Sequence, residues 1–159
     1  MTNEALYQLQ YPIGKFEIPT SISKNKLEDW ISILEHFPNR LEYLVKNLSD
    51  KQLDTSYRPE GWTVRQVVHH LSDSHHHSYI RFKWALTEEN PVIKAYDESL
   101  WAELFDSKTG PIEMSLQHLK AIHFKLVYLL KNFLRAINIA SPPHKLYEIV
   151  PHLDQSFLS

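Results

Sequence analysis

Histidines crowd one short stretch of this chain: HHLSDSHHH, residues 69–77, holds five of them in nine positions. The whole chain has ten histidines. Imidazole binds divalent metal ions and changes its charge near neutral pH, so such a cluster can hold a metal or move protons. Two histidines of one helix can share an ion only when they are three or four residues apart.

No pair in this stretch has that spacing. His69 and His76 are seven residues apart, as are His70 and His77. Seven residues span about 10 Å of helix, which is too far for two rings to hold one ion. The stretch therefore predicts at most one metal ligand.

A helix places His70 at the edge of its apolar side, in a row that continues through Ser74, His77 and Arg81. A second row points further outward and contains His69, Asp73 and His76. Asp73 lies within one turn of both His69 and His70, where a carboxylate can accept an imidazole N–H and orient the ring. The alternative is a polar helix surface on which most of these histidines are solvated.

Other residues give weaker signals for chemistry. His118 and His123 follow on a later helix, and His123 falls on its apolar stripe, which predicts a hydrogen-bonded core histidine. Tryptophans at 62, 84 and 101 can line a pocket or pack in the core. The chain has no cysteine, which excludes disulfides, thiolate zinc sites and a cysteine nucleophile. It also has no glycine-rich phosphate loop, no Gly-x-Ser-x-Gly and no His-Glu-x-x-His.

Three long helices must position these residues. Apolar residues recur at helical spacing over 25–48, 63–86 and 111–133. Thr63 and Gln66 form a capping box at the start of the second helix, and Pro38 should kink or divide the first. We expect an extended segment over 11–19 and a short helix near the end of 87–104. After Phe133 the pattern loosens, so the prediction is an all-α bundle whose fourth helix is divergent or incomplete.

Bulk composition excludes several classes of function. A length of 159 residues suits one domain, and a formal net charge of −2 without a basic cluster argues against nucleic acid. No segment is apolar over a membrane-spanning length, and the first residues do not resemble a signal peptide. These observations predict a soluble cytoplasmic protein.

The stretch YRPEGWTVRQVVHHLSDSHHHSYIRFKWALTEENPVIKAYDESLWAEL, residues 57–104, closely resembles the YfiT branch of the DinB/YfiT-like superfamily. Residues 11–16, 34–59 and 114–133 resemble other parts of the same family. We therefore expect one domain over 1–159, family-like over 11–133, with a divergent tail over 134–159.

The resemblance implies a four-helix bundle with one divalent ion, zinc or nickel, held by three histidines. It also implies a metal-dependent hydrolase, or a thiol transferase of the bacillithiol type, in which the metal activates water or a thiol. The family's first ligand precedes a Leu in VVHHL, which corresponds to His70, and by its spacing Asp73 is a candidate to support that ligand.

The family's other two ligands form a His-x-x-x-His on the last helix, and the sequence departs from the pattern there. After Phe133 it has only His144 and His152, eight residues apart with Pro151 between them. The alternative is therefore a truncated or non-catalytic family member that holds no ion tightly. Apolar faces left without a fourth helix would favour a homodimer.

Overall fold

A computed structural model describes residues 2–15, 17 and 19–139 of the chain. The helices of this part are α1 (Asn3–Gln10), α2 (Lys24–Val45), α3 (Asp50–Leu53), α4 (Val64–Thr87), α5 (Glu98–Ala102), α6 (Phe105–Thr109) and α7 (Ile112–Ile139). The described residues form no strand, only an isolated bridge between Ser56 and Thr63. The predicted all-α class is confirmed.

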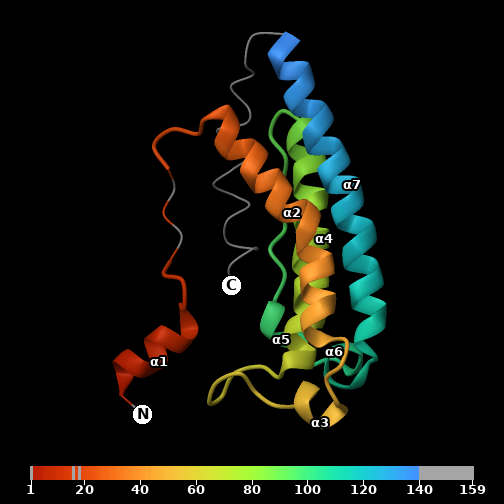
Figure 1. Cartoon of the computed structure of the whole chain (residues 1–159). Coiled ribbons are helices and arrows are strands. Elements are labelled where there is room, and N and C mark those ends of the chain that lie inside the picture. Colours follow the sequence, from red (N-terminus) through yellow and green to blue (C-terminus); the bar gives the residue numbers. More distant parts are fainter. Residues whose placement is uncertain (1, 16, 18, 140–159) are drawn as a thin grey trace.

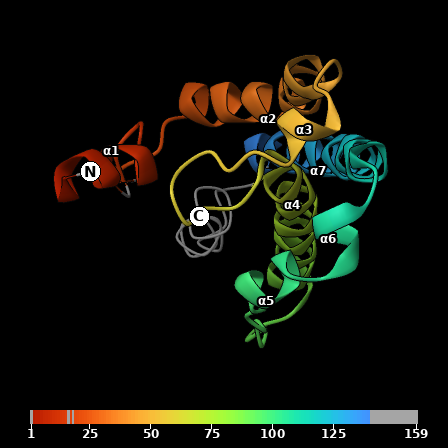
Figure 2. The same cartoon turned by 90° about the horizontal axis from the view of Figure 1, so that it is seen from below.

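Three long helices form the body of the molecule. α2 runs antiparallel to α4 and α7, which run parallel to each other (Figure 1). α1 lies apart from them at the end of the extended segment, as both cartoon views show (Figures 1 and 2). In the part of the chain that the structure describes, no helix is both long and apolar enough to span a bilayer.

Local sequence signals explain the ends of α4. The Oγ1 of Thr63 accepts a hydrogen bond from the backbone N–H of Gln66 at 3.1 Å, and the Gln66 Oε1 accepts one from the Thr63 N–H at 2.9 Å. This is the predicted capping box, and α4 ends within one residue of its expected limit. α1, α3 and α6 were not predicted, because helices of eight, four and five residues show too few turns for periodicity to identify them.

α2 continues through Pro38, so the predicted alternative of two separate helices is wrong. The helix instead changes direction along its length (Figure 1), as is usual where a proline lies inside a helix. Pro38 is buried and has no N–H to offer the carbonyl of Leu34, one turn earlier. That carbonyl is therefore available to another donor.

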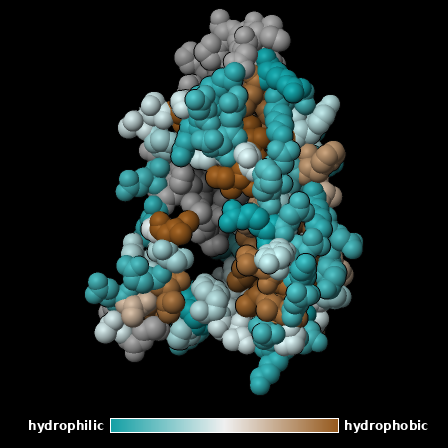
Figure 3. All heavy atoms as spheres, in the orientation of Figure 1, coloured by the Kyte–Doolittle hydropathy of each residue, from teal (hydrophilic) through white to brown (hydrophobic). Residues whose placement is uncertain are grey.

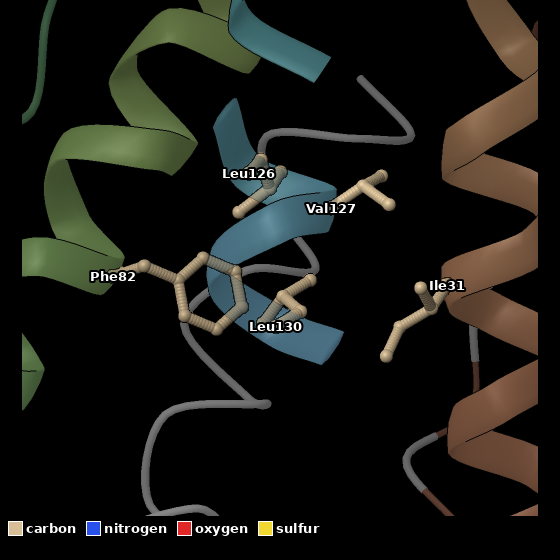
Figure 4. Packing of buried hydrophobic residues seen from close by; sticks show 5 residues of the cluster. All are labelled: Ile31, Phe82, Leu126, Val127 and Leu130. Carbon is tan, nitrogen blue, oxygen red and sulfur yellow. The ribbon is translucent and has the colours of Figure 1, made fainter. Parts of the chain in front are cut away.

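Two apolar clusters hold the long helices together. The upper cluster joins α2, α4 and α7 through Ile31, Phe82, Leu126, Val127 and Leu130 (Figure 4). The lower cluster contains Val45, Leu53, Val68, Ile112 and Leu116. Together they fix the rotation of α4, and that rotation decides where each of its histidines points.

Arg65 fastens the first turn of α4. Its side chain is 7% exposed, and its Nε and Nη2 donate to Asp54 at 2.7 Å and to Asp50 at 2.8 Å. Its Nη1 donates to the carbonyl oxygen of Gly110 at 3.0 Å, just before α7 begins. The guanidinium thus joins α4 by hydrogen bonds to the α3 region and to the turn before α7.

Candidate functional site

The five clustered histidines divide between two sides of α4. His69, His75 and His76 meet residues of α7 or the turn before it, whereas His70 and His77 meet aromatic residues outside α7. His69, His70 and His75 are buried, and the other two are half-buried. The alternative that most of them are solvated is therefore wrong, because α4 is covered on more than one side.

His75 and His123 form a buried pair between α4 and α7. The Nδ1 of His123 lies 2.6 Å from the carbonyl oxygen of Leu34, which can only accept, so this nitrogen carries a proton. Burial lowers the pKa of His123, and the neutral ring then accepts at Nε2 from the Nδ1–H of His75, 2.5 Å away. Burial, followed by the neighbouring His123 and His70, lowers the pKa of His75 to about 3. Both rings are therefore neutral near pH 7.

The acceptor for this pair is the carbonyl that Pro38 leaves without a helical partner. Leu34 lies four residues before Pro38, so its carbonyl lacks the usual helical N–H. The ring of Phe37 packs on both imidazoles, with ring centroids 5.2 Å from His75 and 5.6 Å from His123. The prediction of a hydrogen-bonded core histidine at 123 is confirmed.

His69 is also structural. Its Nδ1 lies 2.7 Å from the Ser115 hydroxyl, and its Nε2 donates to the Gly110 carbonyl at 3.2 Å. Burial lowers the pKa of His69. The sequence placed this residue on an outward row, which is wrong, because the start of α7 covers that side of α4.

His76 and His118 form a third contact between α4 and α7, nearer the surface. The Nδ1 of His76 lies 3.0 Å from the Nε2 of His118, whose Nδ1 lies 2.8 Å from the buried hydroxyl of Ser72. Three of the five clustered histidines thus hold two helices together.

His70 lies apart from these three contacts with α7. It is 6% exposed, and its ring centroid lies 4.7 Å from that of Trp62, in the turn before α4. His77, two turns further along α4, stacks on Tyr96 with ring centroids 4.3 Å apart and planes 5° from parallel. Trp101 of α5 completes this aromatic wall, 4.8 Å from Tyr96. We call the side of α4 that carries His70, Asp73, His77 and Arg81 the open face.

The electrostatics of the open face differ from those of bulk solvent. Burial raises the pKa of Asp73 to about 6, with a smaller contribution from the charge of Asp106. Burial lowers the pKa of His77, and the neighbouring Arg81 lowers it further. In the described residues, no hydrogen bond joins an imidazole N–H of His69 or His70 to the Asp73 carboxylate as acceptor. The suggestion that Asp73 orients a metal ligand therefore stays a prediction.

The described residues do not complete a metal site. The structure describes residues 2–15, 17 and 19–139. In this part of the chain, no three His, Cys, Asp or Glu side chains come close enough together to hold one ion. His70 can supply one imidazole, and a set of three ligands needs at least one from outside this part. His144 and His152 lie outside the described residues.

A separate hollow of about 620 Å³ lies along α2. Its lining includes His36, Arg40 and Tyr43 and none of the open-face residues. Figure 3, in the orientation of Figure 1, shows apolar patches among hydrophilic surface.

The sequence predicted that Arg81 lies in the row of His70, but it did not identify Tyr96. Tyr96 lies in a connecting segment without periodicity, so only its stacking on His77 identifies it.

Comparisons with known proteins agree with this architecture. The model of the DinB superfamily matches residues 33–150. A Bacillus subtilis (strain 168) protein named "Putative metal-dependent hydrolase YfiT" is 53% identical over 123 residues, covering 77% of this chain and 69% of that protein. A relative from Bacillus cereus (strain AH820), named in the same way, is 54% identical over 122 residues, covering 77% of this chain and 70% of its own.

A solved structure of YfiT from Bacillus subtilis superposes with a TM-score of 0.77 at 52% identity, covering 79% of this chain and 71% of that one. It is described as "a probable metal-dependent hydrolase with an unusual four-helix bundle topology". The family match, the identity and the shared topology agree, and this chain therefore belongs to the DinB superfamily.

Proposed function

We propose that this chain is a metal-dependent hydrolase or thiol transferase whose site lies on the open face of α4, with His70 as a ligand of one zinc or nickel ion. The observation that carries the proposal is the position of His70. It is buried against Trp62 and lies apart from the three histidine contacts that join α4 to α7. The relatives' names, which call them metal-dependent hydrolases, support the same chemistry.

The other open-face residues suit such a site. When bound, the ion supplies a Lewis acid that makes water or a thiol nucleophilic near neutral pH. Asp73, with its pKa raised to about 6 by burial, is ionised at pH 7 and basic enough to accept a proton. Tyr96 and Trp101 supply an apolar wall for a small-molecule substrate, which for the transferase is a low-molecular-weight thiol.

Metal content tests this proposal. Protein stripped with a chelator is given one equivalent of zinc or nickel, passed through a desalting column and analysed for the ion. We expect retention in the wild type and loss of retention in His70→Ala. His76→Ala is the matched control, because it removes a histidine of the α7 side. Equal retention in both variants would contradict the proposal.

A second candidate is a family member that does not catalyse. It is favoured by a different observation: the described residues gather no three metal-binding side chains around one point. In that case neither the wild type nor either variant would retain the ion on the desalting column. The same measurement therefore separates the two functions.

A further inference from the structure

Two buried polar atoms on one side of α4 lack partners. Among the residues that the structure describes, the Nε of Arg81 and the hydroxyl of Tyr96 are the buried side-chain atoms without a hydrogen bond. Leaving such a group unsatisfied is costly, and each instance in a folded protein calls for an explanation, such as a missing ligand. The nearby α7 side offers a contrast, since the rings of His69, His75 and His123 all have partners there.

The two atoms belong to one neighbourhood. Tyr96 stacks on His77, and His77 lies one turn before Arg81 on α4. Burial raises the pKa of Tyr96 to about 12, and the charges that act on it include those of Asp73 and Arg81. The Ser74 hydroxyl is also near enough to lower that pKa, but it does not form a hydrogen bond of ordinary geometry with Tyr96. The phenol therefore lies over the part of α4 between His70 and Arg81.

We propose that the open face of α4 binds a small ligand through a carboxylate group, with the Arg81 guanidinium and the Tyr96 hydroxyl as its hydrogen-bond donors. Both donors suit an oxygen acceptor, because a guanidinium only donates and a phenol with a high pKa keeps its proton. The inference rests on the proposed function, since it gives the substrate class for the same face.

Charge favours a carboxylate over a phosphate. Arg81 brings one positive charge, and His77 stays neutral near pH 7 because burial and Arg81 lower its pKa. Asp73 and Glu98 are close enough to act on Tyr96 and would repel a second negative charge on the ligand. Along α4, about 16 Å separate the backbone positions of His70 and Arg81. A ligand that reaches both residues is therefore elongated.

Ligand binding to metal-free protein tests this inference without depending on the ion. Hexanoate, acetate and inorganic phosphate are titrated in the presence of a chelator, with tryptophan fluorescence as the signal, because the ring centroid of Trp101 lies 4.8 Å from that of Tyr96. We expect saturable binding that is tighter for hexanoate, an elongated ligand with one negative charge, than for phosphate. Tyr96→Phe and Arg81→Gln should each weaken it about tenfold or more, as expected for the loss of a hydrogen bond to a charged group.

Matched controls are Tyr128→Phe and Arg40→Gln, whose side chains are exposed on α7 and α2. They should bind like the wild type. His76→Ala, which changes a histidine of the α7 side, should also bind hexanoate like the wild type. Because the titrations are made in the presence of a chelator, failure of this inference and failure of the proposed function are distinguishable. Tighter binding of phosphate, no saturable signal, or equal effects of the control variants would overturn the inference.

Stability provides a second readout that does not depend on a ligand. Removing a buried hydroxyl without a partner should leave the melting temperature of Tyr96→Phe unchanged or higher. A clear fall in that temperature would mean that the hydroxyl is already satisfied within the fold, which would also overturn the inference.

Discussion

The two sides of α4 use the same residue type in opposite ways. On the α7 side, His69, His75 and His76 each find a hydrogen-bond partner in or just before α7. On the open face, the neighbourhood of His77 contains the unpartnered hydroxyl of Tyr96 and the unpartnered Nε of Arg81. Satisfied polar groups stabilise the fold, whereas unsatisfied ones are available to a ligand.

The two sides of α4 show how a histidine-rich motif should be interpreted. A count of imidazoles suggests a metal cluster, but the partners of each ring decide its role. Within one stretch of nine residues, three histidines hold helices together and two lie on the open face. Each prediction below tests whether the two sides of α4 differ in this way.

The largest expected effect is on the buried pair. His75→Ala should lower the free energy of unfolding by about 3 kcal/mol, because it leaves a cavity and removes the donor to the Nε2 of His123. His70→Ala should cost only about 1 kcal/mol, since the ring packs on Trp62 of the turn before α4. Urea denaturation followed by circular dichroism measures both. Equal losses would mean that the two sides do not differ in their contribution to stability.

Acid should lower the stability of the fold through His75, which joins α4 to α7. Its pKa is about 3 in the folded protein against an ordinary value of 6.5, so between these pH values the unfolded chain binds a proton that the folded chain does not. Stability is therefore full above pH 6.5 and falls by about 1.4 kcal/mol per pH unit as the pH drops toward 3. Between pH 3 and 6.5, the free energy of unfolding should depend more steeply on pH in the wild type than in His75→Gln. The difference in slope should be about 1.4 kcal/mol per pH unit. Identical slopes would contradict a neutral buried His75.

Asp73 should behave in the opposite sense. Its folded pKa of about 6 exceeds the ordinary 3.8, so the folded state holds its proton more firmly and stability falls as the pH rises from 4 to 6. At pH 7, Asp73→Asn should therefore stabilise the metal-free protein by about 1 kcal/mol, after allowance for partial exposure. At pH 3 the variant should match the wild type. Thermal melts at the two pH values measure this, and a destabilised variant at pH 7 would show that the carboxylate is already paired.

The smallest effect concerns His118, whose contact with His76 lies near the surface. His118→Ala should cost about 0.5 kcal/mol, because water can replace much of a half-exposed hydrogen bond. The same urea assay applies. A loss as large as that of His75→Ala would extend the structural role to the whole α7 side, surface included.

Local features of the sequence determined the helices of this protein. A capping box starts α4, Gly110 and Pro111 precede α7, and a run of apolar residues at helical spacing defines each long helix. These signals act between residues a few positions apart, so they can be recognised without the fold. The same holds for the spacing argument that the histidine stretch cannot hold an ion by itself.

Only the tertiary structure decided what each histidine does. The partners of His69, His75 and His76 lie more than 40 residues away in sequence, and the ring that stacks on His77 comes from an irregular segment. The prediction from residue spacing assumed that α4 has one buried side. In the structure, α7 covers one side of α4, and the Trp62 turn and the α5 region pack on another. The carbonyl that anchors the buried pair is available because Pro38 lacks an N–H, and only the packing of α7 against α2 brings His123 to it. Hydrogen bonds between distant segments depend on how helices rotate against one another, and core packing sets that rotation.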